Sequence, residues 1–369
     1  MSRSNCPKID WGTVAIQPRP RKLRLWRKNK SLIYNLLPLQ NPASSAGLSY
    51  TLGMGGIAVM SALITTVTGA LLMFYYEPTL QGAYPSLALI DSVVYLGRFT
   101  RALHYWAAQV MVVAVVIHTA RIVFTGGYRP PRDVNWFIGL GLLLVTLVWN
   151  FSGYALRYDA SSIWALLVGT NLLKELPVVG STLYVLIVGG QTLGPATILR
   201  FYTWHVFALA LLGLGGIGYH LWRVRVDGGI SRPDWMAGQP RRFVPPETIL
   251  FRELITGLIL TAGLMLLSTF APPRLGPPAD LNRVSGEVVQ APWFFLAIQW
   301  LLRYFSPLWG GWLIPLAGLV LLAVLPLVDR RGPGRGRWFA RERWLPQAAF
   351  GGLLVLIVIL SLLELWQGG

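Results

Sequence analysis

Seven apolar segments, each long enough to cross the hydrocarbon core of a membrane, dominate this sequence. A membrane-spanning helix needs about 20 mostly apolar residues. The chain of 369 residues is 54% hydrophobic and 13% charged, whereas soluble domains carry roughly 25% charged residues. The segments run near residues 53–76, 102–123, 134–156, 201–222, 254–271, 309–328 and 347–366. The sequence therefore predicts an all-α integral membrane protein with about seven transmembrane helices.

The net charge of +17 is concentrated in loops. Basic runs precede the first span and lie between spans two and three, four and five, and six and seven. These regions share one side, which the positive-inside rule assigns to the cytoplasm, so the C-terminus is expected outside. The pattern favours a multi-pass protein of a bacterial cytoplasmic membrane over a nucleic-acid-binding protein. The first 30 residues lack a signal-peptide pattern, so we expect membrane entry through the spans themselves.

All four histidines of the chain lie in two of the spans. His104 and His118 stand 14 residues apart in the second span, and His205 and His220 stand 15 apart in the fourth. At about 100° per residue, these steps end about 40° short of four turns and about 60° past them, so each pair shares one helix face. Both spans run in the same direction. His104 can therefore face His205 near the outer surface, and His118 can face His220 near the inner one.

Two facing histidine pairs are suited to two b-type haems, each held non-covalently between two neutral imidazoles in an apolar sheath. Cys6 is the single cysteine, which excludes a multi-cysteine zinc or iron–sulfur site within this chain. The alternative is that each histidine only hydrogen-bonds a neighbouring helix. The matched spacing and direction of the pairs favour haem.

Glycines and arginines near the histidines suit the same interpretation. Missing side chains at the height of each pair would let a flat macrocycle approach the backbone, and arginines at the span ends could pair with haem propionates. The glycines, again 14 apart in spans one and three, are Gly55, Gly69, Gly139 and Gly153. The arginines are Arg101, Arg121, Arg200 and Arg225. Simple helix packing and snorkelling are the alternative roles.

An ordered series of motifs resembles the cytochrome b subunit of cytochrome bc and b6f complexes. Within residues 50–233 the series is "TVTGALLMFYYEPT", "RALH", "HTAR", "GGYRPPRDVNW", "SGYALRYD", "LPVVG" and "TILRFYTWH". The 15-residue histidine step resembles the b6 branch, and the part after residue 233 resembles a fused subunit IV. The resemblance implies a basic cytoplasmic segment (1–48), a b6-like di-haem four-helix bundle (49–233) and a subunit IV-like region of three further helices (234–369).

The resemblance also implies an activity and partners. Relatives oxidise quinol on the outer side and pass electrons through two b haems to a quinone on the inner side, which contributes to proton translocation. A Rieske iron–sulfur protein and a c-type cytochrome or similar acceptor are the expected partners, in a complex that is a homodimer.

The resemblance places the quinol site between "SGYALRYD" and "APWFF". Tyr154, Trp293 and Phe294 are then its expected residues. Pro292 stands where the family has a glutamate that accepts a proton from quinol, so Asp159 or Glu287 is the hypothetical proton carrier. Gly53 stands where chloroplast-type relatives attach a third haem through cysteine; this argues against a covalent third haem and leaves a non-covalent one open.

Two other function classes remain open at this stage. A di-haem membrane anchor of another quinone-linked dehydrogenase or reductase also uses four intramembrane histidines, although it does not require these motifs in this order. A non-redox transporter could use the histidines as proton relays.

Overall fold

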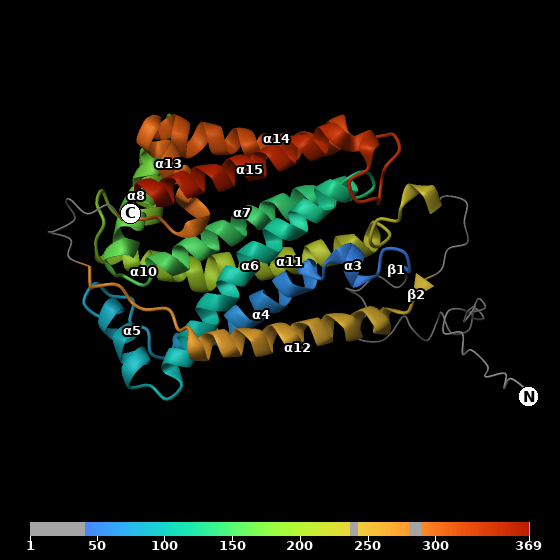
Figure 1. The fold of residues 1–369 in the computed structure, drawn as a ribbon. Coiled ribbons are helices and arrows are strands. Elements are labelled where there is room, and N and C mark those ends of the chain that lie inside the picture. Colours follow the sequence, from blue (N-terminus) through green and yellow to red (C-terminus); the bar gives the residue numbers. More distant parts are fainter. Residues whose placement is uncertain (1–40, 237–242, 280–288, 369) are drawn as a thin grey trace, which may run out of the picture.

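The computed structural model of the chain describes residues 41–236, 243–279 and 289–368. Among these residues, seven helical runs are long and apolar enough to cross a membrane, which confirms the predicted all-α membrane fold (Figure 1). The runs are α4 (Met54–Leu72), α6 (Gly97–Thr125), α7 (Asp133–Ala155), α10 (Pro195–Thr203) continued through the π-helical turn η2 (Trp204–Leu209) into α11 (Ala210–Val226), α12 (Pro246–Phe270), the π-helical turn η5 (Leu308–Leu313) continued into α14 (Ile314–Val328), and α15 (Trp344–Gln367).

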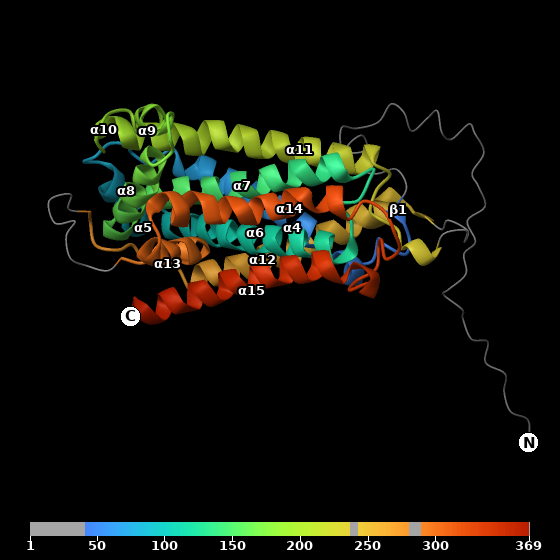
Figure 2. The ribbon, with the colours of Figure 1, turned by 90° about the horizontal axis from the view of Figure 1, so that it is seen from above.

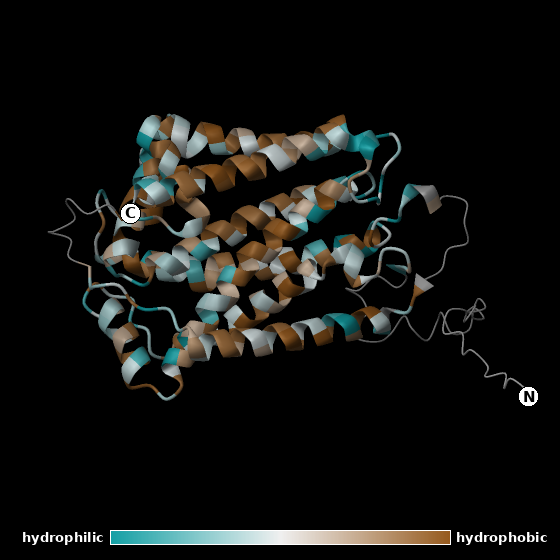
Figure 3. Ribbon diagram, viewed as in Figure 1, coloured by the Kyte–Doolittle hydropathy of each residue, from teal (hydrophilic) through white to brown (hydrophobic). Residues whose placement is uncertain are grey.

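Apolar side chains run along the long helices, and hydrophilic residues are concentrated toward the two ends of the molecule (Figure 3). Many large apolar side chains point outward, for example Phe207 and Leu258, which are 65% and 62% exposed. In water such a surface would be unfavourable. In a bilayer it contacts lipid, so these helices do not need a partner on every face.

The loops after α6, α11 and α14 lie at the same end of the molecule as strand β1 (Asn41–Pro42) (Figure 1). We call this end the basic end, because these are the arginine-rich loops of the sequence. The opposite end carries the loops after α4, α7 and α12 and the last helical residues of α15. The prediction that the basic loops share one side is thereby confirmed for the described part of the chain.

The helices α4, α6, α7 and α10–α11 form one bundle, and the three later spans pack around it. α12 lies along α4 and α6, whereas α14 contacts α7 and α15 contacts α6 (Figures 1 and 2). At the basic end β1 pairs antiparallel with β2 (Phe243–Val244), a two-residue ribbon in an otherwise helical fold. A short helix, α3 (Leu48–Thr51), leads from β1 into the bundle.

Short helices cover the opposite end of the bundle. They are α5 (Ala83–Ser92), α8 (Ala160–Lys174), α9 (Gly180–Val188) and α13 (Leu296–Tyr304), with a single 3₁₀ turn, η4 (Trp293–Phe295), before α13. Asp159 begins α8 with a capping box: its carboxylate accepts from Ser162 N, and Ser162 Oγ accepts from Asp159 N. Such a cap satisfies backbone donors that the first turn leaves free.

The segment 271–279, which follows α12, crosses this end of the bundle, and we call it the strap. Its carbonyls accept hydrogen bonds from Trp106 Nε1, Arg101 Nη2 and Tyr84 Oη at 2.9, 2.6 and 2.9 Å. The Gly276 amide donates to Asp159 Oδ2 at 3.1 Å. The strap is therefore tied to the loops and helix ends that surround the bundle.

A buried charged network joins the α6–α7 loop to the α14–α15 loop at the basic end. Asp329 pairs with Arg129 and with Arg343, and it accepts a 2.5 Å hydrogen bond from Tyr128 Oη. Burial acts to raise the pKa of Asp329, but the hydrogen bonds from Arg129, Tyr128 and Arg343 outweigh it, so the pKa lies below its ordinary value. This network fixes the last two spans to the bundle.

Candidate functional site

The four histidines meet as two pairs inside the bundle. The ring centroids of His104 and His205 are 6.3 Å apart, and those of His118 and His220 are 6.4 Å apart. In each pair α6 supplies one imidazole and the α10–α11 run supplies the other. The His118–His220 pair lies toward the basic end, and the His104–His205 pair toward the opposite end. The pairing expected from the spacing is thus the pairing in the structure.

A π-helical turn explains how spacings of 14 and 15 residues give matching pairs. The turn η2 (Trp204–Leu209) contains His205 and lies on the way to His220. A π turn accommodates one residue more than the α-helical ladder and is frequent at functional sites. The 15-residue step therefore behaves like a regular step of 14, and the overshoot of about 60° calculated for a regular helix does not arise.

Each histidine packs against one of the four predicted glycines. A Cβ added to Gly55 would meet His118 at 3.4 Å, and one added to Gly139 would meet His220 at 3.4 Å. At the other pair, a Cβ on Gly69 would meet His104 at 3.1 Å, and one on Gly153 would meet His205 at 2.7 Å. The glycines therefore create the space in which the imidazoles lie.

Hydroxyl groups engage the Nδ1 atoms of one pair. Thr68 Oγ1 lies 3.1 Å from His104 Nδ1, and Ser152 Oγ lies 3.0 Å from His205 Nδ1. A partner on Nδ1 orients the ring and leaves Nε2 as the nitrogen that can bind a metal. His220 Nδ1, by contrast, is buried without a hydrogen-bond partner in the described part of the protein.

The dimensions of the pairs suit one metal ion between two imidazoles. An imidazole nitrogen binds a first-row metal at about 2.0–2.1 Å, and its ring centroid lies about 1.2 Å behind it, so centroids on opposite sides of one metal are about 6.4 Å apart. Both observed separations agree with this value. The four residues and their glycines thus fit axial ligation of two haems.

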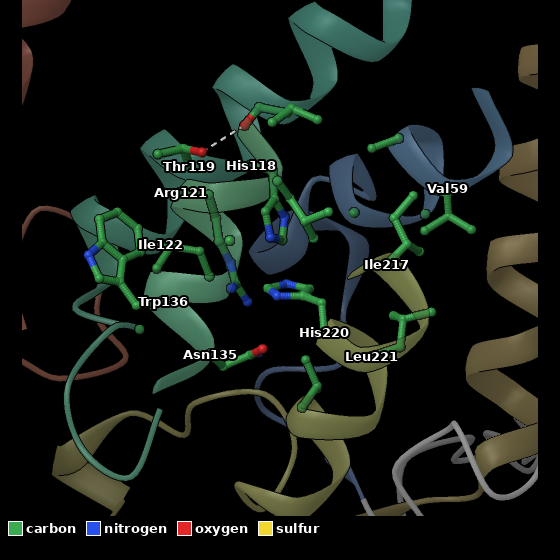
Figure 4. Close-up of a pocket in the computed structure, with 18 of the residues that line it drawn as sticks. Val59, His118, Thr119, Arg121, Ile122, Asn135, Trp136, Ile217, His220 and Leu221 are labelled. Carbon is green, nitrogen blue, oxygen red and sulfur yellow. Dashed lines mark hydrogen bonds between the residues drawn. The ribbon is translucent and has the colours of Figure 1, made fainter. Parts of the chain in front are cut away.

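A cavity of about 260 Å³ surrounds the His118–His220 pair, and we call it the inner cavity. Figure 4 shows these two imidazoles pointing toward one another, with Arg121 beside them and Asn135 below. Arg121 is only 6% exposed, lies over the Tyr50 ring at 4.9 Å, and has a buried Nε without a partner among the described residues. An unpaired buried guanidinium suits an anionic group such as a propionate.

A second cavity of about 370 Å³, the outer cavity, surrounds the His104–His205 pair. Arg101 lines it and also forms a bidentate ion pair with Asp91 at 2.5–2.6 Å. The cavity continues past the histidines to Tyr154, Trp293 and Phe294, the predicted quinol-site residues. One continuous space therefore joins a histidine pair to this aromatic wall.

Two predicted arginines line neither cavity. Arg200 donates instead to the main-chain carbonyls of Val185 and Leu186 in α9. Arg225 lies near the end of α11 at the basic end. A position close to a histidine in the sequence did not predict whether an arginine lines a cavity. The direction of a long side chain depends on neighbours that the sequence does not reveal.

Asp159 is fully buried, and its carboxylate is occupied by structural contacts. It pairs with Arg157, caps α8 through Ser162, and accepts from Gly276 in the strap. Proton acceptance by Asp159 stays a prediction, and it requires the ion pair with Arg157 to open. Glu287, the other predicted carrier, lies outside the described residues.

Sequence reasoning missed Glu253, a carboxylate of α12 that lines the inner cavity. Its Oε2 is buried and makes no hydrogen bond within the described structure. It occupies space that Gly56 leaves free, since a Cβ at Gly56 would overlap this carboxylate. The predicted span 254–271 began one residue after Glu253, whereas α12 begins at Pro246 and so takes this acidic residue into the helix. Acidic residues are rare in membrane-spanning helices and usually functional.

Comparison with known proteins assigns the family. The model described as "Cytochrome b(N-terminal)/b6/petB" matches residues 109–278. The chain is 37% identical over 194 residues to the cytochrome b6 of Heliobacterium mobile, which covers 91% of that protein and 53% of this chain. This chain belongs to the cytochrome b6 family. The cytochrome b6 of Synechococcus elongatus is 36% identical over 180 residues, covering 83% of that protein and 49% of this chain.

The fold likeness extends beyond the b6-like part. A chain described as "Hyperthermophilic respiratory Complex III" matches with a TM-score of 0.74 over 85% of this chain and 83% of that chain, at 24% sequence identity. As a cytochrome b, the protein is a multi-pass membrane subunit of a bc-type electron-transport complex and binds b-type haem.

Proposed function

We propose that this cytochrome b holds two b haems in a quinol:cytochrome c oxidoreductase, or in a complex with a similar acceptor. The observation that carries the proposal is the two pairs of facing imidazoles, one toward each end of the bundle, with ring centroids 6.3 and 6.4 Å apart. His104 and His205 would hold one non-covalent b haem, and His118 and His220 would hold the other. Arg101 and Arg121, which line the two cavities, would pair with the haem propionates, and Arg200 and Arg225 are the more distant predicted cations.

The bound haems supply single-electron transfer across the membrane. The chain's own residues hold the axial imidazoles, exclude water and provide apolar walls. Trp149 helps in this by donating from Nε1 to the His205 carbonyl at 3.1 Å, which fixes the backbone of the π turn. Four glycines keep the ligand imidazoles clear of α4 and α7.

Quinol oxidation takes place in the outer cavity. Tyr154, Trp293 and Phe294 line it and offer flat apolar contacts to a quinol ring. One electron of the quinol passes to a Rieske iron–sulfur protein and on to a c-type cytochrome or similar acceptor, and the other enters this chain. Asp159 or Glu287 carries a proton outward from this site.

Quinone reduction takes place in the inner cavity, where protons are taken up from the cytoplasm. Glu253 supports this assignment, because a carboxylate without a hydrogen-bond partner in a membrane interior is costly unless it has a ligand or proton to bind. Its position beside Gly56, one residue from the glycine under His118, puts it at the histidine pair of the basic end.

The basic end faces the cytoplasm of a bacterial cell, which leaves the C-terminus outside. The protein functions within a homodimeric complex, and residues 49–233 and 234–369 act as b6-like and subunit IV-like parts. These 369 residues contain one cysteine, Cys6, so they cannot themselves ligate a Rieske cluster, and a partner supplies it.

Haem stoichiometry of the purified complex tests the proposal. We expect a reduced-minus-oxidised spectrum combined with acid–acetone extraction to give two extractable b haems per chain. No haem should remain bound to the protein after extraction, because Gly53 stands where the resemblance places the attaching cysteine. The variants His104→Leu and His118→Leu should each retain one haem, and a different one. A wild-type complex without haem would sink the proposal, and a covalent haem would overturn the assignment at Gly53.

A further inference from the structure

The outer cavity differs from the family pattern in its polar groups. Pro292 lines this cavity, at the position where the resemblance to cytochrome b implies a quinol-site glutamate. Among the described residues that line the cavity, none carries a carboxylate. A quinol bound there would need another group to hydrogen-bond its oxygen, because an unpaired polar atom in an apolar pocket is costly.

Gln109 is an uncharged polar side chain in that cavity. It follows His104 by five residues on α6, or about 7.5 Å along the helix axis. Its Oε1 accepts a hydrogen bond of 2.6 Å from Trp293 Nε1. Both residues line the cavity together with Tyr105 and Phe294. The bond joins α6 to the η4 turn, which is 184 positions away in the sequence.

The hydrogen bond to Trp293 fixes the orientation of the Gln109 amide. Because the indole N–H can only donate, Oε1 is the atom that faces Trp293, and the Nε2 amino group points elsewhere. Within the described part of the chain, Nε2 makes no further hydrogen bond. The side chain therefore offers two N–H donors beside an aromatic wall.

We propose that Gln109 is a substrate-binding residue of the outer cavity, whose Nε2 donates a hydrogen bond to the oxygen of a quinol or quinone ring packed on Trp293. The inference rests on the proposed quinol oxidation at this site. An amide is not basic, so Gln109 orients the ring and does not accept its proton. Trp293 acts on the ring directly by contact and on Gln109 by holding its amide.

A purely structural role for Gln109 is the competing explanation, since polar side chains often link membrane helices. That role needs only Oε1 and the indole, and it predicts no dependence of quinol binding on the donor at Nε2. The two explanations therefore separate in variants that change the donor and keep the size of the side chain.

The test uses the intact complex and two short-chain probes, decylubiquinol and menadiol, because the native quinone is unidentified. Gln109→Met removes both polar groups at similar volume. We expect KM for the better probe to rise about three- to tenfold, the effect of one neutral hydrogen bond, with kcat within about twofold. Gln191→Met, at an exposed glutamine in the loop before α10, is the matched control and should leave both constants unchanged.

A second variant, Gln109→Glu, tests whether residue 109 donates a hydrogen bond to the quinol or only links α6 to Trp293. A protonated carboxyl can donate to the quinol oxygen, whereas a carboxylate can only accept. KM should therefore approach the wild-type value at low pH and rise as the new carboxyl ionises. The wild-type complex and Gln109→Glu share the arginines, tyrosines and two histidines of the cavity. The difference between the pH profiles of KM in these two complexes therefore reports on residue 109 alone.

Equilibrium binding of the oxidised probe, decylubiquinone, to the resting complex gives a readout independent of turnover. Its dissociation constant should rise in Gln109→Met by the same factor as KM. Unchanged KM, unchanged binding and a flat difference profile in Gln109→Glu would overturn the inference for Gln109. A wild-type complex that contains two haems yet oxidises neither probe would instead contradict the proposed function.

Discussion

The contacts between histidines and glycines are graded in closeness. The space beside His205 is the smallest, where a Cβ at Gly153 would come within 2.7 Å, whereas the two contacts nearest the basic end are 3.4 Å. A separation below 3.0 Å forces a shift of the imidazole, but 3.4 Å is ordinary van der Waals contact. The four glycines are therefore not equally replaceable.

Gly153→Ala should displace the His205 ring and remove the haem of the outer cavity. We expect roughly one of two haems to be lost, measured as haem per chain by the pyridine haemochrome method. Gly139→Ala on the same helix should retain both haems. Gly141→Ala, where a Cβ meets nothing within 4 Å, controls for the change in helix propensity, which favours alanine. Full haem content in Gly153→Ala would show that the ring has room to move.

Among single residues, the sequence predicted the paired histidines and the glycines beside them, but not the polar side chains around the cavities. The histidines and glycines were predictable because their spacing repeats along helices of known geometry. The spacing did not predict Glu253 and Gln109, because the neighbour that defines the position of each lies more than 100 positions away. Glu253 packs beside Gly56, and Gln109 accepts a hydrogen bond from Trp293. Arg200 was assigned by proximity in sequence, and its guanidinium instead binds carbonyls of α9.

Among the elements, the π-helical turn η2 sets the register of the fourth span. It absorbs one residue between His205 and His220, so that α10–α11 presents both rings to α6. The mismatch between the histidine steps of 14 and 15 residues was only an indirect signal of this turn. A regular helix was the simplest assumption, and backbone hydrogen bonding in a single turn cannot be deduced from side-chain periodicity.

Changing the length of this turn should have asymmetric effects. Deleting Val206 allows a regular helix with a 14-residue step, so we expect both haems to be retained. Inserting one alanine after Val206 requires a second irregular turn, because one added residue rotates the helix by about 100°, and we expect loss of one haem. Optical spectra of both complexes provide the measurement. Equal haem loss in both variants would mean that the turn itself, and not the register, is required.

For the whole molecule, the network around Asp329 determines how the last two spans are attached. Arg343 is 1% exposed and Arg129 is 4% exposed, so neither can be hydrated if the carboxylate is lost. Leaving a buried charge without its partner costs about 3–5 kcal/mol. The sequence predicted the spans that this network joins, but it could not predict the network, whose members come from loops about 200 positions apart.

Asp329→Asn should therefore lower the thermal midpoint of the detergent-solubilised complex by several degrees. Glu342→Gln is the matched control, because its ion pair with Arg337 is 42% exposed on the glutamate side and exposed pairs contribute at most about 1 kcal/mol. A midpoint in Asp329→Asn as high as in the control would contradict a stabilising role.

The lowered pKa of Asp329 also predicts a pH dependence with a definite sign. A carboxyl whose pKa is lower in the folded state stabilises the protein above its ordinary pKa, and this stabilisation is lost as the pH falls through the folded-state pKa. The thermal midpoint should therefore decrease as the pH is lowered below about 4, which is near the ordinary pKa of aspartate. Asp329→Asn should lack this component, so subtracting its profile from that of the wild type isolates it.

The strap has a consequence for the order in which the protein is made. A chain grows from its N-terminus, so the four-helix bundle, in which two helical runs carry every histidine, is complete before residues 271–279 leave the ribosome. Only then can Arg101, Tyr84 and Asp159 bind the strap across that end of the bundle. A group that entered the outer cavity across this end of the bundle would therefore have to do so before these contacts form.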